Sequence, residues 1–272
     1  MSPNTLYQYN TITALLHGIC ADGLLASSLA NYGTCGIGTI SDLDGEIIIL
    51  DSEVYHFPSN NSTSATTTAE SPAPTVRTPT PTERIPFAML TTFQPTHSIP
   101  LPRSYGPLTS QALPSYLFSQ ALDGKRNHPL AIRLTTTFTS LTIRVIPMRS
   151  STKETLATCA ARQSISKLGP IEGTLFGFWS PQYMAGLGVP GFHLHFLSND
   201  KQRGGHVLDF ETYPATEPGQ GELEVAVLGR MEMEVPDTEE FGSFGGDIQV
   251  PGGEEVHRAE GLVDRVENRV YG

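Results

Sequence analysis

Residues 191–210, GFHLHFLSNDKQRGGHVLDF, contain three of the eight histidines of the chain within an alternating pattern of apolar residues. Side chains alternate between the two faces of a strand, so His193 and His195 share one face and their apolar neighbours share the other. The polar and glycine-rich segment 198–205 is typical of a turn, which predicts a hairpin with His206 at the start of the return strand. Cross-strand neighbours lie roughly 5 Å apart. The pattern therefore predicts that three imidazoles converge on one point.

Three converging histidines are the ligand set of a catalytic zinc ion, which keeps a fourth position open. Neutral imidazoles leave the ion its full charge, and this favours Lewis-acid chemistry over a structural role. No cysteine lies near the stretch, which argues against a structural zinc knuckle. Copper, iron or manganese would suit the same ligands. A pair of exposed strand histidines without any metal remains the alternative interpretation.

Outward from this stretch, the sequence predicts a strand-rich α+β protein. Short amphipathic helices are expected within 6–31 and over 152–166, and a helix is expected in the tail at 254–270. Alternating residues at 221–228 and 230–235 predict two paired strands. A change from helix to successive strands near Pro170 predicts two domains. The first, 1–170, would hold a mixed sheet, and the second, 171–272, would be smaller, mostly antiparallel and would carry the hairpin and the tail.

One segment has the composition of an exposed loop. Residues 59–83 contain 12 Ser or Thr and 4 Pro among 25 residues, with Val76 as the one large aliphatic side chain. Such a segment buries too little apolar area to offset its ordering entropy. We expect a flexible insertion between two strands, either a tolerated insertion or a regulatory phosphorylation loop.

Composition and charge exclude several classes of function. The chain has 272 residues, 38% of them hydrophobic, and a net charge of −11. An acidic chain without a basic cluster is a poor partner for nucleic acid or an anionic membrane. Neither a membrane-length apolar run nor a basic, apolar leader is evident, and three cysteines are too few for a disulfide framework. A cytoplasmic protein acting on a small molecule is the expectation.

At the level of motifs, the sequence resembles the alpha-acetolactate decarboxylase family. The resemblance covers nearly the whole chain and is carried by the histidine stretch together with four further segments: 6–11 (LYQYNT), 36–39 (GIGT), 43–46 (LDGE) and 173–179 (GTLFGFW). It implies a two-domain α/β fold, usually a homodimer, that decarboxylates 2-acetolactate to acetoin and CO2. It also implies one Zn2+ per chain as the cofactor, with His193, His195 and His206 as its ligands.

The resemblance also implies roles for residues outside the histidine stretch. Glu46, after Leu-Asp-Gly, and Glu260, in the Val-His-Arg-Ala-Glu segment of the tail, would be catalytic, as proton donors or added metal ligands. Arg144 would bind the substrate carboxylate, with Arg133 as a competitor for that role. Thr39 would line the pocket. The segment before Glu260 is expanded with Gly and Pro relative to the family pattern.

The implied reaction explains why such a site needs a cation. Loss of CO2 leaves an electron pair that must pass into the adjacent ketone, and a Lewis acid such as zinc stabilises the resulting enediolate intermediate. Two other interpretations stay open. In one, the protein is a cupin-like metal oxygenase that uses the two clustered histidines and Asp200. In the other, it is a metal-binding relative that has lost its catalytic activity.

Overall fold

The computed structural model describes residues 2–59, 76–101, 106–120, 122, 124–214 and 221–243. Within these ranges the protein is rich in strands and contains a few short helices, which agrees with the predicted α+β class. Most of the predicted insertion lies outside the described residues, as does the expected tail helix at 254–270. No helix among the described residues is both long and apolar enough to span a membrane.

The first sheet has six strands in the order β15-β1-β7-β3-β4-β5. Its strands are β1 (Thr5–Tyr9), β3 (Cys35–Thr39), β4 (Glu46–Leu50), β5 (Glu53–Phe57), β7 (Phe87–Thr91) and β15 (Arg230–Glu234). The β1–β15 pair is parallel and the other pairs are antiparallel. The sheet is therefore mixed. Its three central strands, β7, β3 and β4, are almost wholly buried, as their apolar sequences require.

The second sheet has seven strands and is antiparallel throughout. It contains β8 (His97–Pro100), β9 (Leu130–Val145), β10 (Ser164–Leu168), β11 (Ile171–Ser180), β12 (Gly191–Ser198), β13 (Gly204–Thr212) and β14 (Glu222–Val227). The 16-residue strand β9 pairs with β10, β11, β13 and β14. It is the strand that joins the others into one sheet.

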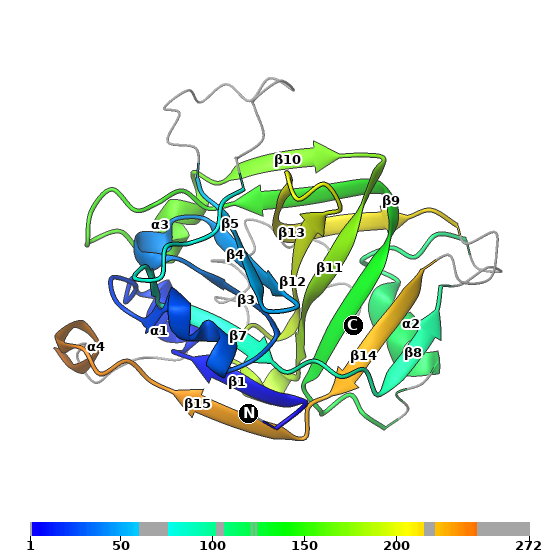
Figure 1. The fold of residues 1–272 in the computed structure, drawn as a ribbon, viewed down its shortest axis with the longest axis horizontal. Coiled ribbons are helices and arrows are strands. Elements are labelled where there is room, and N and C mark those ends of the chain that lie inside the picture. Colours follow the sequence, from blue (N-terminus) through cyan, green and yellow to red (C-terminus); the bar gives the residue numbers. More distant parts are fainter. Residues whose placement is uncertain are drawn as a thin grey trace.

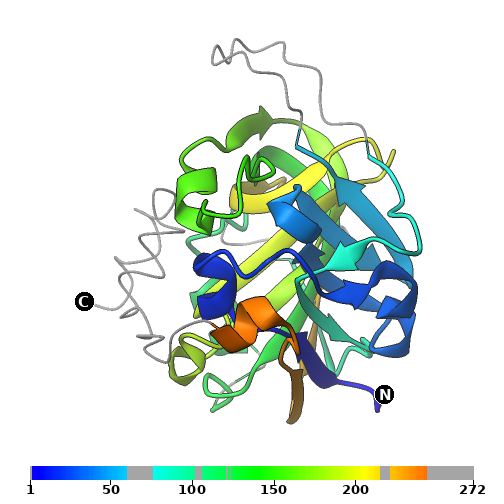
Figure 2. The same cartoon turned by 90° about the vertical axis from the view of Figure 1, so that its left-hand side faces the viewer.

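Short helices and a two-stranded sheet complete the described structure. They are α1 (Ile12–Leu16), η1 (Ala26–Asn31), η2 (Ser41–Leu43), α2 (Leu113–Gln120), α3 (Leu156–Ala160), η3 (Gln182–Met184) and α4 (Glu239–Ser243), with β2 (Leu24–Leu25) pairing β6 (Arg84–Ile85). Side chains of Thr11 and Thr155 cap the N-termini of α1 and α3. These two helices contact each other, and both views place them with α4 on the same side of the molecule (Figures 1 and 2).

The two sheets pack against each other across the largest buried core (Figure 1). Strands β12 and β13 contact β4, and β11 contacts β3. Phe57 and Phe87 from the first sheet join Phe176 and Phe178 from the second in this core. The face of β12 that carries the histidines is therefore covered by the first sheet, while its other face packs into a second core cluster.

The change of sheet does not fall at residue 170. Strands β8, β9 and β10 precede that position and already belong to the second sheet, whereas β15 returns to the first sheet near the end of the described chain. Long-range pairing along β9 decides this arrangement. Near Pro170 the chain runs on from β10 into β11 in the same direction, and both strands pair with β9 in one register, so this position interrupts a strand and does not separate two sheets.

Several local predictions are wrong. Residues 5–9 form a strand because they pair on both sides, with β7 and β15, and all five side chains are buried. The helix predicted over 152–166 is limited to α3 and is followed by strand β10. The segments 221–228 and 230–235 are strands but do not pair with each other, since β14 pairs with β9 and β8 while β15 pairs with β1.

The described end of the predicted insertion contacts the first sheet. The backbones of Arg77 and His56 exchange two hydrogen bonds of 2.8 and 3.0 Å. The Arg77 guanidinium donates to both carboxylate oxygens of Glu83, at 2.8 and 2.5 Å. This bidentate hydrogen bonding holds the pKa of Glu83 down at about 2. The ion pair therefore closes the segment 77–83 beside β5.

Gly177→Ala tests the close packing of β11 on β12. A Cβ at this position would lie 2.0 Å from the carbonyl oxygen of His193, so the strands must separate. We expect a loss of about 1–3 kcal/mol in the free energy of unfolding, the usual cost of overpacking. Urea denaturation measures this loss. Gly229→Ala is the control, because no atom lies within 4 Å of its Cβ, and equal losses in the two variants would contradict the packing.

Glu83→Gln tests the Arg77–Glu83 pair through pH. Because the folded-state pKa of Glu83 is about 2, below its ordinary 4.5, its charged form stabilises the fold above pH 4.5. That contribution disappears as pH falls from 4.5 towards 2. Wild type should therefore lose more stability than Glu83→Gln across this range in thermal melts. Asp22→Asn, at the exposed Asp22–Arg84 pair, is the control, and parallel curves for wild type and Glu83→Gln would refute the pair.

Candidate metal centre and active site

Three histidines converge on one point between the sheets. In the β12–β13 hairpin His195 lies directly opposite His206, and His193 is two residues earlier on the same face of β12. Their ring centroids are 4.9–5.4 Å apart, and one ring nitrogen from each lies within 4.8 Å of the others. Alternation along one strand and register across the hairpin together produce this cluster.

Hydrogen bonding fixes which nitrogen of His195 is available. Its Nδ1 lies 2.7 Å from the backbone oxygen of Ile47, and a carbonyl only accepts, so Nδ1 carries the proton. The lone pair is then on Nε2. Among the described residues, this buried Nε2 has no hydrogen-bond partner, and neither has the buried Nδ1 of His193. Buried polar atoms without partners are costly, which points to a missing ligand.

The charge state of the rings also suits a cation. Burial and, to a lesser extent, the charge of Arg144 lower the pKa of all three histidines, and the pKa of His195 falls to about 3 although its hydrogen bond with the Ile47 backbone opposes the shift. The rings are therefore neutral at pH 7, the form in which imidazole binds metals. The donor set and the two unpartnered nitrogens fit a divalent ion such as zinc.

Glu46 lies beside the histidines at the start of β4. Its Oε2 is 3.6 Å from Nε2 of His195, and the residue is buried. Burial raises the pKa of this carboxyl to about 7, although the charge of Arg144 and a hydrogen bond with the Ile146 backbone oppose the shift. A carboxyl with such a pKa exchanges a proton readily near neutral pH.

The turn before Glu46 has an unusual backbone. Asp42, Leu43 and Gly45 all have positive φ, at 61°, 61° and 72°. Left-handed conformations cost non-glycine residues roughly 1–2 kcal/mol each. At Gly45 a side chain is also excluded, since a Cβ would lie 1.9 Å from the Phe57 backbone oxygen. The hydroxyl of Thr39 donates to the Gly45 oxygen at 2.6 Å and stabilises the turn.

Arg144, and not Arg133, lies at the pocket. Arg144 is buried on β9 beside His206, with Nη1 3.3 Å from Oε1 of Gln163 and with Nε unpartnered among the described residues. Arg133 lies far from Arg144 along β9, where it packs over the Phe93 ring and pairs with Glu224 at 2.6 Å, and it does not line the pocket. Cross-strand pairing puts both arginines on the same face of the sheet, so their separation along the strand, and not the face, keeps Arg133 out of the pocket.

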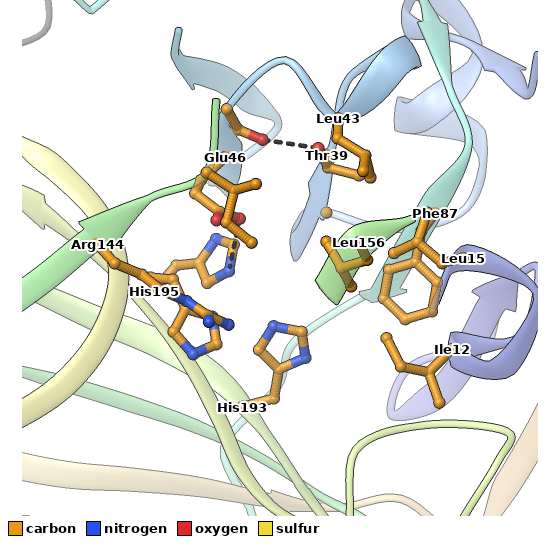
Figure 3. A pocket seen from close by; sticks show the side chains of 14 residues that line it. Ile12, Leu15, Thr39, Leu43, Glu46, Phe87, Arg144, Leu156, His193 and His195 are labelled. Atoms are coloured by element: carbon orange, nitrogen blue, oxygen red, sulfur yellow. Dashed lines mark hydrogen bonds and ion pairs between the residues drawn. The ribbon is translucent and has the colours of Figure 1, made fainter. Parts of the chain in front are cut away.

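The pocket has a polar side and an apolar side (Figure 3). The polar side contains Thr39, Glu46, Arg144, His193, His195 and His206. The apolar side is formed mainly by α1, α3 and β7, and its residues are Ile12, Leu15, Leu43, Phe87, Ile146 and Leu156. Such a pocket can hold a small anion that chelates a cation while apolar groups exclude water.

The structure thus brings together most of the residues that the sequence singled out. Glu260 lies outside the described residues. Asp200, the acid of the oxygenase interpretation, is in the hairpin turn, where it accepts hydrogen bonds from Ser198 and Gln202, and it does not line the pocket. Sequence reasoning missed Gln163 and the apolar side. Helical periodicity around Ile12 and Leu15 was a signal for a buried face but not for a pocket.

Comparison with known proteins gives one consistent result. A model of the family "Alpha-acetolactate decarboxylase" matches residues 6–244. An alpha-acetolactate decarboxylase from Brevibacillus brevis is 33% identical over 259 residues, covering 94% of this chain and 81% of the relative. One from Methylococcus capsulatus is 31% identical, covering 94% and 88%. The family match ends before Glu260.

Solved structures agree with the sequence comparison. The crystal structure of alpha-acetolactate decarboxylase from Bacillus subtilis strain 168 superposes with a TM-score of 0.80 at 25% identity and covers 94% of this chain and 98% of that one. A Staphylococcus aureus protein, described as of unknown function and similar to alpha-acetolactate decarboxylase, gives a TM-score of 0.78. The fold of this chain is therefore the fold of these proteins.

His193→Ala tests the metal site directly. Removing one of three neutral ligands should lower the content of divalent metal in the purified protein to near zero, well below that of the unsubstituted protein. Elemental analysis after dialysis measures this. His97→Ala, on β8 and outside the pocket, is the control and should keep its metal. Full metal content in the His193 variant would rule out the three-histidine site.

Proposed function

Because the chain belongs to the alpha-acetolactate decarboxylase family, we propose that it converts 2-acetolactate to acetoin and CO2, with zinc held by His193, His195 and His206. One observation carries the proposal. The unpartnered imidazole nitrogens, the Arg144 guanidinium and the Glu46 carboxyl meet in one buried pocket of a chain that matches the family over residues 6–244.

The reaction breaks one carbon–carbon bond and needs a place for its electron pair. As CO2 leaves, the pair passes into the neighbouring ketone and gives an enediolate, which takes up a proton to become acetoin. When bound, a divalent cation supplies Lewis-acid stabilisation of this negative charge. Binding, orientation and proton delivery are the tasks of the protein side chains.

Arg144 is proposed to bind the carboxylate that is lost. Its planar guanidinium suits bidentate contact with a carboxylate, and its Nε has no partner among the described residues. The contact with Gln163 leaves most of its donors available. A local positive charge is needed because the net charge of −11 repels an anion at long range.

Glu46 is proposed to deliver the proton to the former carboxyl-bearing carbon. It is the carboxyl among the described residues that lines the pocket, and it lies 3.6 Å from His195. The hydrogen bond from Thr39 to Gly45 holds the turn that precedes it. Its position beside the histidines supports this role for a substrate that chelates there.

The apolar side is proposed to exclude water and to accept the methyl groups of the substrate. Ile12, Leu15, Phe87 and Leu156 lie across the pocket from Arg144 and Glu46 (Figure 3). Exclusion of water strengthens the electrostatic interactions of the charged groups.

An acetoin assay combined with elemental analysis tests the proposed function. Purified protein should release acetoin and CO2 from acetolactate, should lose this activity with a chelator, and should regain it with zinc. Turnover should be the same without oxygen, which separates a decarboxylase from an oxygenase. Bound zinc without turnover of either acetolactate enantiomer would instead support a relative that has lost its activity.

Arg144→Met should weaken substrate binding. A hydrogen bond to a charged group contributes about 1.5–3 kcal/mol, so kcat/KM should fall about 10- to 100-fold, mainly through a higher KM. Steady-state acetoin formation measures both constants. Arg133→Met removes an arginine of β9 that pairs with Glu224 outside the pocket, and it should leave both constants unchanged. Equal effects of the two substitutions would contradict the assignment.

A further inference from the structure

We propose that Arg149 is a positioning residue of the decarboxylation. It holds the segment 41–46, which we call the 41–46 turn, so that the Glu46 carboxyl reaches the substrate. The inference rests on the proposed function. Arg149 does not line the pocket, and it therefore acts through the turn and not on the substrate.

The contacts of Arg149 are concentrated on this turn. Its side chain is 2% exposed, and Nε donates to Oδ1 of Asp42 at 2.7 Å. Its backbone N–H donates to the Asp42 oxygen at 2.8 Å. The side chain and the backbone of Arg149 thus both donate hydrogen bonds to Asp42. Glu240 on α4 lies 3.8 Å from Nη1 and adds a second carboxylate near the buried charge.

The 41–46 turn needs stabilising contacts of this kind because its backbone is strained. Asp42 and Leu43 adopt positive φ without being glycine, and such residues persist only where surrounding contacts hold them. Asp42 is the first of these residues and the one that Arg149 contacts. Leu43 and Gly45 then line the pocket, and Glu46 follows directly. A relaxed turn would move Glu46 first among the polar groups of the site.

Arg149 also connects the turn to two other parts of the pocket. Its Nη1 donates to the Gly18 oxygen at 2.8 Å, just after α1, the helix that supplies Ile12 and Leu15. It follows Ile146 in the segment that leaves β9, and the Ile146 oxygen accepts from the Gly45 N–H at 3.2 Å. One guanidinium therefore joins three segments around the position of Glu46.

The positions of the three histidines and of Arg144 do not depend on the contacts of Arg149. They project from β12, β13 and β9, where His195 pairs directly with His206 and His206 with Arg144 across the sheet. Arg149→Met should therefore keep its metal content and a KM within about twofold of wild type. Its kcat should fall about 10- to 100-fold, since a displacement near 1 Å of a reacting group costs about this much. This separation of kcat from KM distinguishes positioning from a merely structural role.

The experiment compares Arg149→Met with Arg149→Lys, Asp42→Asn and the control Arg133→Met. Steady-state acetoin formation, metal content and melting temperature are measured for each holoenzyme. Arg149→Lys keeps the positive charge but has a single ammonium group in place of the planar guanidinium, so its kcat should be higher than that of Arg149→Met. Asp42→Asn removes the partly exposed carboxylate partner and should lower kcat in the same way even if Arg149→Met fails to fold. Arg133→Met should match wild type.

A double-mutant cycle identifies Glu46 as the group that is positioned. In Glu46→Asp the carboxyl is already displaced, so adding Arg149→Met should lower kcat less than threefold further. Full additivity would overturn the inference. So would an unchanged kcat with a lower melting temperature, or a loss of metal in the Arg149 and Asp42 variants. An inactive wild type would instead reject the proposed function, so the two failures are distinguishable.

Discussion

Burial of three neutral imidazoles between two sheets is the constraint on which the rest of the site depends. Their face of β12 is covered by the first sheet, so water is largely excluded from Nδ1 of His193 and Nε2 of His195, which have no partner within the described part of the chain. Buried polar atoms of this kind are tolerated where a bound ligand supplies the missing interaction. The hydrogen bond from His195 to the Ile47 backbone orients one ring and links the hairpin to β4.

Two strands, β4 and β9, supply the charged groups beside the histidines. Strand β4 begins with Glu46 directly after a strained turn, and β9 carries Arg144 beside His206. Burial and a nearby positive charge act in opposite directions on the Glu46 carboxyl, and its pKa near 7 is the balance of the two. Side chains on rigid strands hold their geometry better than side chains on loops. The turn at 41–46 is the exception, and it is tied down by many contacts.

Sequence reasoning reached the parts of this arrangement that follow from local periodicity. Alternation in 191–197 and the polar turn after it were enough to predict that three histidines converge. The roles predicted for Glu46 and Arg144 came from the family resemblance, since Arg133 and Arg144 lie on one strand and on the same face of the sheet, and local sequence does not tell them apart. Local periodicity could not show which strands pair with each other, and this long-range pairing determines the sheet to which each segment belongs. Residues 5–9 became a strand between β7 and β15, and β14 and β15 separated into different sheets.

Anomalous diffraction from crystals of the purified protein, recorded on both sides of the zinc absorption edge, tests the central claim most directly. We expect a single strong zinc peak at bonding distance from one nitrogen of each of His193, His195 and His206, with Nε2 as the ligand atom of His195. An empty pocket in zinc-replete crystals, or a zinc ion bound elsewhere with the three rings apart, would contradict it.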